Sequence, residues 1–241
     1  MEISEKELRA LVRDVDDAHR AGMEHAEDDI RELHFGEGAR VMGTARRTFL
    51  QRAGITGATV AVGSALLPIS GLIASAGAQS LDDGDIAAFA ESVELAAVQA
   101  YTLAAQSGKV TTKAVLDAAT TFAGHHKEHA GAFGGAAGSK ATGKANAALL
   151  AALGPQLSAA ADEKAVIEFA YGLENAAAAT YLFAIGALTS SAALALTASI
   201  LPVEAQHAIV LGSVNGKTLA DMIPKFETKD LALDPTKYPT K

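Results

Sequence analysis

Two stretches of the sequence decide the fold: FAESVELAAVQAY at residues 89–101 and FAYGLENAAAATY at residues 169–181. They align without a gap at a constant offset of 80 residues, so that Glu94 matches Glu174 and Tyr101 matches Tyr181. Both stretches are rich in alanine, which is the strongest helix former. They are therefore predicted to be equivalent helices, and a repeat of helix pairs predicts a bundle with approximate twofold symmetry.

Each stretch places a glutamate seven residues before a tyrosine, Glu94 before Tyr101 and Glu174 before Tyr181. Seven residues make about two helical turns, so each pair shares one helix face. The rest of that face is apolar. A carboxylate on it must be paired, protonated or bound to metal, because burying it alone costs too much free energy. The two tyrosines fit either an ordinary core position with a polar tip or a place beside a buried site.

Capping and breaking residues outline the helices of an all-α chain. Long helices are expected at about 82–106, 112–133, 162–188 and 191–215. The connection between the second and third helices is long enough for the third to start at the opposite end of the bundle. It is predicted to contain a mobile loop at 134–146 and a short helix at 146–157. The tail, 217–241, contains three prolines and is expected to be extended.

The second and fourth helices carry candidate metal ligands. Glu204-Ala205-Gln206-His207 is an E-x-x-H motif, whose side chains at i and i+3 reach one point on the bundle axis. His126 and His129 have the same spacing within the run HHKEH at 125–129. One such motif arises often by chance. Two of them combined with the repeated Glu–Tyr pair indicate a buried metal site. The alternative is a hydrogen-bonded network of the same residues without metal.

With these motifs in this order, residues 81–216 resemble the ferritin-like superfamily, specifically its exported bacterial members. The resemblance implies a four-helix bundle with a long crossover and an iron site, with manganese or zinc as further candidates. The residues that it places around the metal as ligands are Glu94, His126, His129, Glu174, Glu204 and His207. From their positions on the same helices, Tyr101, Tyr181, His125 and Glu128 are expected in a second layer around the site. His126, expected at the edge of the site, departs from the family pattern, which has a glutamate there. This departure leaves a dinuclear, a mononuclear or a zinc-like site open.

Composition excludes several classes of function. The net charge is −8, and an acidic surface argues against nucleic acid as a partner. The chain has no cysteine, which excludes disulfides, thiolate metal sites and a cysteine nucleophile. A metal site here must therefore use His, Asp and Glu. The sequence shows no assembly surface, so a homo-oligomer stays an open expectation.

The first 80 residues read as two segments. Residues 1–43 are polar and acidic, and we expect a solvated charged helix there that carries His19. Residues 44–80 contain Arg46-Arg47, then a weakly apolar run, and the A-x-A sequence at 76–78. This order resembles a twin-arginine export signal, cleaved after Ala78, although the residues flanking its arginine pair depart from the usual pattern. It implies the twin-arginine machinery as a partner, transient membrane contact through 53–75, and a periplasmic or extracellular location. An uncleaved membrane anchor is the alternative.

Two function classes remain. The first is an exported redox metalloprotein that acts on iron or manganese, as a ferroxidase or another oxidoreductase. The second is a metal-free structural or stress-related envelope protein on a degenerate bundle. The sequence does not decide whether the chain is an enzyme.

Overall fold

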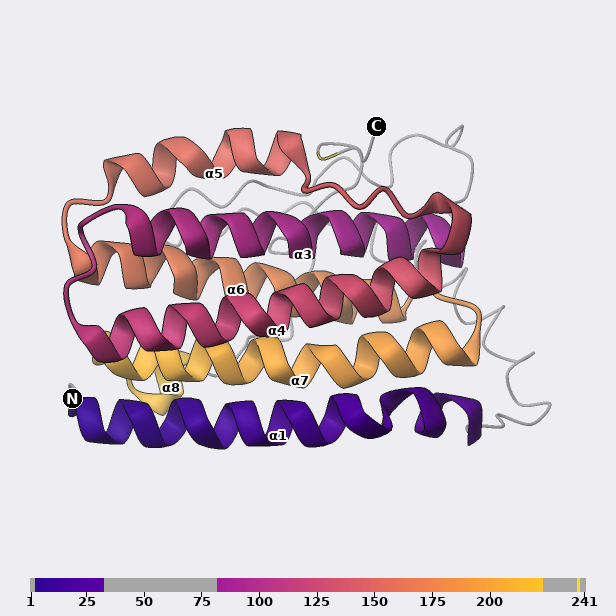
Figure 1. Ribbon diagram of the computed structural model, residues 1–241, viewed down its shortest axis with the longest axis horizontal. Coiled ribbons are helices and arrows are strands. Elements are labelled where there is room, and N and C mark those ends of the chain that lie inside the picture. The colour runs from indigo at the N-terminus through magenta and orange to yellow at the C-terminus, as the bar shows by residue number, and fades with distance from the viewer. Residues whose placement is uncertain (1–2, 33–81, 223–237, 239–241) are drawn as a thin grey trace.

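A computed structural model describes residues 3–32, 82–222 and 238 of this chain. Most of these residues are helical, and none of them forms a strand. The central bundle consists of α3 (Asp83–Gln106), α4 (Lys113–Ala137), α6 (Glu163–Ile185) and α7 (Ser191–Val214). Figure 1 shows α3 antiparallel to α4, and α6 antiparallel to α7. The predicted all-α four-helix bundle is therefore confirmed.

The connection between α4 and α6 crosses the length of the bundle. Its main element, α5 (Ala147–Ala159), lies along α3, so that α6 begins at the end where α4 begins (Figure 1). The crossover is tied to α3 by hydrogen bonds from Asn146, whose backbone N donates to Ser92 O over 2.9 Å. The buried Glu91 carboxylate also accepts from the backbone N of Thr142 (2.7 Å) and Gly143 (3.1 Å). Glu91, which is not part of any motif recognised in the sequence, thus holds the connection in place.

Helix ends follow the capping residues closely. Asp82, Asp162 and Ser190 cap α3, α6 and α7 through their side chains, as expected at helix N-termini. The prediction of a loop from Gly134 was wrong at its start. Helix α4 continues to Ala137 and is followed by the 3-10 turn η1 (Gly138–Lys140), because Phe133 and Ala137 are buried against the bundle. Packing of an apolar face outweighs the low helix propensity of the glycines.

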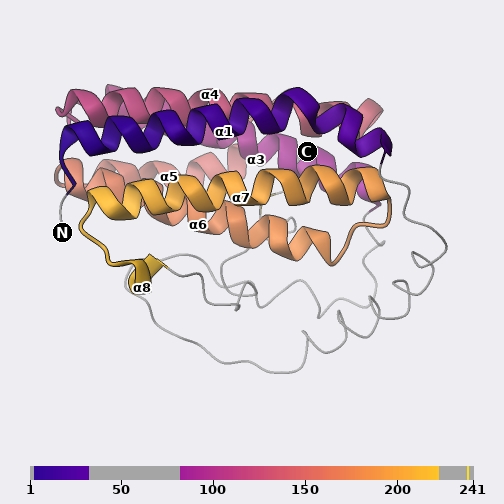
Figure 2. The ribbon, with the colours of Figure 1, turned by 90° about the horizontal axis from the view of Figure 1, so that it is seen from below.

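A fifth long helix, α1 (Glu5–Glu32), lies along the bundle against α4 and α7, as Figures 1 and 2 show from two sides. Leu8, Val12, Val15 and His19 are buried in this contact. Their spacing of four, three and four residues places them on one stripe. The expectation of a solvated helix was therefore wrong for this face. Most other described positions of α1 carry polar or charged side chains and are exposed.

Two further features concern the C-terminal half. Helix α7 is, among the described helices, the one long and apolar enough to cross a membrane by length and composition. It carries Glu204 and His207 into the bundle, as the core helix of a folded domain does. The tail was predicted to be extended, but its first described part forms a short helix, α8 (Leu219–Met222), that packs on α7. The predicted export segment, 44–80, lies outside the described residues, as does most of the tail.

Candidate metal centre

Six ionisable side chains meet at the middle of the bundle. Each is at most 1% exposed, and they come from all four central helices. They are Glu94 of α3, His126 and His129 of α4, Glu174 of α6, and Glu204 and His207 of α7. These are the six residues predicted as ligands, and the structure brings all of them together.

The six side chains form two overlapping groups, each with one ligand atom per residue within 4.8 Å of the others. The first group holds Glu94, His126, His129 and Glu204, and the second holds His126, Glu174, Glu204 and His207. His126 and Glu204 belong to both. Two adjacent positions with shared members are the arrangement that a pair of metal ions requires.

Glu204 shows an unusual environment for a buried carboxylate. His129 Nδ1 lies 2.9 Å from its Oε1 and His207 Nδ1 lies 3.3 Å from its Oε2. Neither oxygen, however, has a hydrogen bond of acceptable geometry among the described residues, and the same holds for His129 Nδ1. These atoms are close together without being aligned as donor and acceptor. Ligand atoms that face a common cation have this relation, whereas an unsatisfied buried carboxylate alone is costly.

His126 lies at the centre of the cluster, so its expected place at the edge was wrong. Its Nδ1 lies 2.7 Å from Glu94 Oε2, and its Nε2 lies 3.1 Å from Glu174 Oε1. The ring therefore links the two glutamates of the sequence repeat. The motif spacing that directs His129 to the axis also directs His126 there, because residues three apart share a helix face.

The two tyrosines of the repeat bond crosswise to its two glutamates. Tyr101 of α3 donates to Glu174 of α6, and Tyr181 of α6 donates to Glu94 of α3. Both tyrosines are buried. The predicted position beside the site is thus observed, and the exchange of partners reflects the approximate twofold axis. Each carboxylate is fixed by a neutral donor that leaves its charge intact.

Neighbouring carboxylates raise the pKa values of the three histidines in the inner cluster. Burial lowers the pKa of His126, but Glu174, Glu204 and Glu94 outweigh it and hold this pKa well above the usual range. Burial also lowers the pKa of His129, but the charge of Glu204 outweighs this effect and raises the pKa to about 9. In turn, His126 and His129 overcome the effect of burial and lower the pKa of Glu94 to about 2. Three carboxylates therefore face imidazoles that are readily protonated when no metal is bound.

A second layer of histidines lies between the cluster and α1. His125 Nδ1 is 2.9 Å from His207 Nε2, and His19 Nε2 is 3.2 Å from His129 Nε2. The rings of His19 and His125 stack at 3.9 Å. Burial is the main cause that lowers their pKa values, to about 3 for His19 and about 4 for His125. Both are therefore neutral near pH 7.

Sequence reasoning missed His19 and placed His125 and Glu128 only approximately. His125 is buried behind His207, as predicted for a residue close behind the ligands. The Glu128 side chain is 56% exposed and lies 3.7 Å from His19 Nδ1, so it belongs to the outer layer. A signal for His19 was available, because it continues the apolar stripe of Leu8, Val12 and Val15 at helical spacing.

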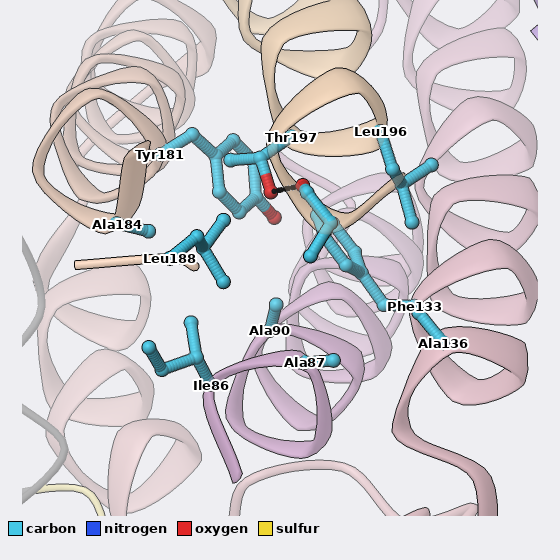
Figure 3. A pocket seen from close by; sticks show the side chains of 11 residues that line it. Ile86, Ala87, Ala90, Phe133, Ala136, Tyr181, Ala184, Leu188, Leu196 and Thr197 are labelled. Atoms are coloured by element: carbon cyan, nitrogen blue, oxygen red, sulfur yellow. Dashed lines mark hydrogen bonds between the residues drawn. The ribbon is translucent and has the colours of Figure 1, made fainter. Parts of the chain in front are cut away.

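An apolar pocket is lined by Tyr181 together with side chains of α3, α4 and α7 (Figure 3). Tyr181 projects from α6, and Phe133, Leu188 and Leu196 lie around it. The pocket has room for about one water-sized molecule, at about 10 Å³, and none of its lining residues other than the tyrosine is ionisable. It offers no recognition group for a charged organic substrate.

This chain belongs to the ferritin-like domain family, whose model matches residues 82–217. The match covers α3 to α7 and therefore all six residues of the inner cluster. Helix α1 lies outside it. No curated protein and no solved structure gave a significant match to the chain.

Proposed function

We propose that this protein binds a pair of transition-metal ions in the inner cluster and uses them in redox chemistry. Glu94 with His129 would hold one ion, and Glu174 with His207 the other. Glu204, which belongs to both groups, would lie between them. Iron or manganese bound there would supply electron transfer to or from a small molecule such as dioxygen or peroxide.

The environment of Glu204 is the observation that carries this proposal. A carboxylate that is 0% exposed, with both oxygens close to histidine Nδ1 atoms and without a well-formed hydrogen bond, fits a cation better than it fits a proton network. Carboxylate and imidazole ligands suit iron and manganese, and zinc also accepts them. The tyrosines would hold one oxygen each of Glu174 and Glu94 in place. The other oxygens, now 3.3 Å from His207 Nδ1 and 2.7 Å from His126 Nδ1, would be the ones to face a metal.

Metal analysis of the full chain tests the proposal. Protein purified without added metal, then reconstituted with Fe(II), Mn(II) or Zn(II), is expected to retain up to two ions per chain after desalting. His129→Ala and Glu204→Ala are each expected to abolish or severely weaken binding, because each removes a ligand without replacement. Asp14→Ala, which removes an exposed carboxylate on the outer face of α1, is the matched control. Wild-type protein that retains no metal under any of these conditions would overturn the proposal.

The second candidate function is that of a metal-free structural or stress-related envelope protein. It is favoured by the charge balance of the cluster, because the raised pKa values of His126, His129 and His207 allow imidazolium ions to neutralise the carboxylates. In that case His129→Ala would chiefly lower the stability of the chain. Metal content and the unfolding midpoint, measured on the same variants, separate the two functions.

We also propose that the chain is exported by the twin-arginine route. The support is sequence alone: Arg46-Arg47, the weakly apolar run and the A-x-A site. A buried metal centre would be consistent with this route. The metal would have to enter while the bundle folds, and the twin-arginine route exports proteins that have already folded.

A further inference from the structure

His129 and His207 lie at opposite ends of the inner cluster, and both ring nitrogens of each lie close to polar side chains. Nδ1 of His129 and Nδ1 of His207 face the glutamates, and their Nε2 atoms face outward, towards His19 and His125. Behind these stand two carboxylates. His125 Nε2 lies 3.1 Å from Asp16 Oδ1, and His19 Nδ1 lies 3.7 Å from Glu128 Oε2. Two parallel rows, each of two histidines and a carboxylate, therefore lead from the cluster to the face covered by α1.

The rows have one consistent proton arrangement when a metal occupies the cluster. A metal on Nδ1 of His207 leaves its proton on Nε2, which donates to Nδ1 of His125. The Nε2–H of His125 then donates to Asp16. In the other row, Nε2–H of His129 donates to Nε2 of His19, whose Nδ1–H points towards Glu128. Every histidine is neutral in this arrangement, and the row through His125 is hydrogen-bonded along its whole length. In the other row His19 Nδ1 is close to Glu128, at 3.7 Å, but has no hydrogen bond among the described residues.

We propose that α1 is a working part of the metal centre, in which His19 and Asp16 are positioning residues for the ligands His129 and His207. The inference rests on the proposed function. Carboxylate-backed partners on the outer nitrogen fix the ring orientation of a ligating histidine and raise its basicity. Here α1 supplies one histidine and one carboxylate for this purpose. Helix α1 lies outside the residues matched by the family model, so the match does not account for this contact.

The burial of His19 supports a positioning role. An imidazole with two polar nitrogens is 2% exposed at a helix contact that is otherwise apolar, formed by Leu8, Val12 and Val15. An apolar side chain would fill this place without the cost of burying two polar atoms. The histidine is instead stacked on His125 and directed at His129. Asp16 is also engaged from outside by Arg20, at 2.6 Å, which restrains its carboxylate beside His125.

The test measures metal affinity and the geometry of the metal, using the full chain loaded with Co(II) as the probe. His19→Ala and Asp16→Ala are each expected to weaken Co(II) binding by roughly 10–100-fold in a chelator competition. Both should change the visible absorption bands of bound Co(II), which report the ligand field. His19→Gln keeps an amide near His129 and is expected to recover most of the affinity. Asp17→Ala, an exposed neighbour on α1, is the matched control and should match the wild type.

The outcomes separate the inference from the proposed function. If wild-type protein binds Co(II), and His19→Ala and Asp16→Ala leave both affinity and absorption bands unchanged, the inference is overturned and the metal centre stands. The inference is also overturned if His19→Ala and His19→Gln weaken binding equally, since the space that His19 fills would then matter more than its hydrogen bond. Wild-type protein that binds none of the metals tried overturns both. Helicity measured by circular dichroism confirms that each variant is folded, and Asp16→Asn replaces Asp16→Ala if it is not.

Discussion

His126 stands where the resemblance to the ferritin-like family implies a glutamate, and its ring reaches Glu94 on one side and Glu174 on the other. A neutral imidazole there gives the cluster one negative charge fewer than the pattern has. A protonated one would add a positive charge beside both ligand groups and would repel metal ions. Both effects disfavour a pair of trivalent ions. If the cluster binds metal as proposed, this residue is therefore expected to influence which metal and which oxidation state it favours.

We predict that His126→Glu raises the affinity for Fe(III) on the order of tenfold and increases ferroxidase turnover, because it restores the missing carboxylate. Iron content after aerobic reconstitution and the rate of Fe(II) oxidation measure the two effects. His126→Gln keeps the polar contacts without the charge and serves as the control. Unchanged metal content, metal identity and activity in His126→Ala would show that His126 is not a ligand.

A second prediction at this scale concerns pH and the metal-free chain. The pKa of His129 is raised to about 9 in the folded state, so its stabilising contribution is fully present below its unfolded value of 6.5. It is lost as pH rises through about 9, and His126 and His207 act in the same direction. With excess chelator, the free energy of unfolding should therefore fall on the order of 1–3 kcal/mol between pH 7 and about 9.

The acid side has the opposite sign, because His19 and His125 stay neutral in the folded chain down to about pH 3 and 4. The unfolded chain takes up protons at both below about 6.5, so stability should decline as the pH falls. Denaturant titrations across the pH range measure the resulting maximum, expected at roughly pH 6–7. In His129→Gln the alkaline decline should be smaller. An alkaline decline as steep as that of the wild type would contradict the assignment to this cluster.

At the scale of elements, the helices were largely predictable because their signals are local. Asp82, Asp162 and Ser190 mark helix starts by side-chain capping, and the sequence repeat alone identifies α3 and α6 as equivalent. The six candidate ligands came from the repeat and from i, i+3 spacing within single helices, together with the family resemblance. His19 did not, because its partner His129 lies 110 residues away, and pairing across that distance depends on where α1 docks. The low helix propensity of Gly134 also misled, since packing decided the end of α4.

The glycines of α4 allow a paired prediction. A Cβ at Gly131 meets nothing within 4 Å, so Gly131→Ala should stabilise the chain by roughly 0.5–1 kcal/mol through helix propensity. A Cβ at Gly134 would lie 2.9 Å from Glu91 Oε1. This carboxylate would have to leave the backbone N–H groups of the crossover, so Gly134→Ala should be neutral or destabilising. Thermal unfolding of both variants measures the difference. In a Glu91→Ala background, which lacks the carboxylate, this difference in stability between the two variants should disappear. Equal stabilisation by Gly131→Ala and Gly134→Ala in the wild-type background would contradict the prediction.

At the scale of the whole molecule, the residues before the bundle are predicted to direct its export. Replacing Arg46 and Arg47 with lysine should trap the precursor in the cytoplasm, because the twin-arginine machinery reads the arginine pair. Immunoblots of cell fractions measure the distribution, with replacement of Arg52 by lysine as the control. Unchanged export would indicate another route or none. Mass spectrometry of the exported chain would show whether it is cut after Ala78 or retains α1.

The docking of α1 on the bundle has a consequence for where and when the metal centre is complete. Helix α1 precedes residues 53–75, and the bundle follows them. If these residues cross a membrane with the amino terminus left behind, α1 and the bundle come to lie in different compartments, and His19 can no longer touch His129. The proposed metal centre would then be covered by α1 while the chain is in the cytoplasm, and it would lose this cover once the bundle has been exported. The outer nitrogens of His129 and His207 would become reachable from solvent only at the destination.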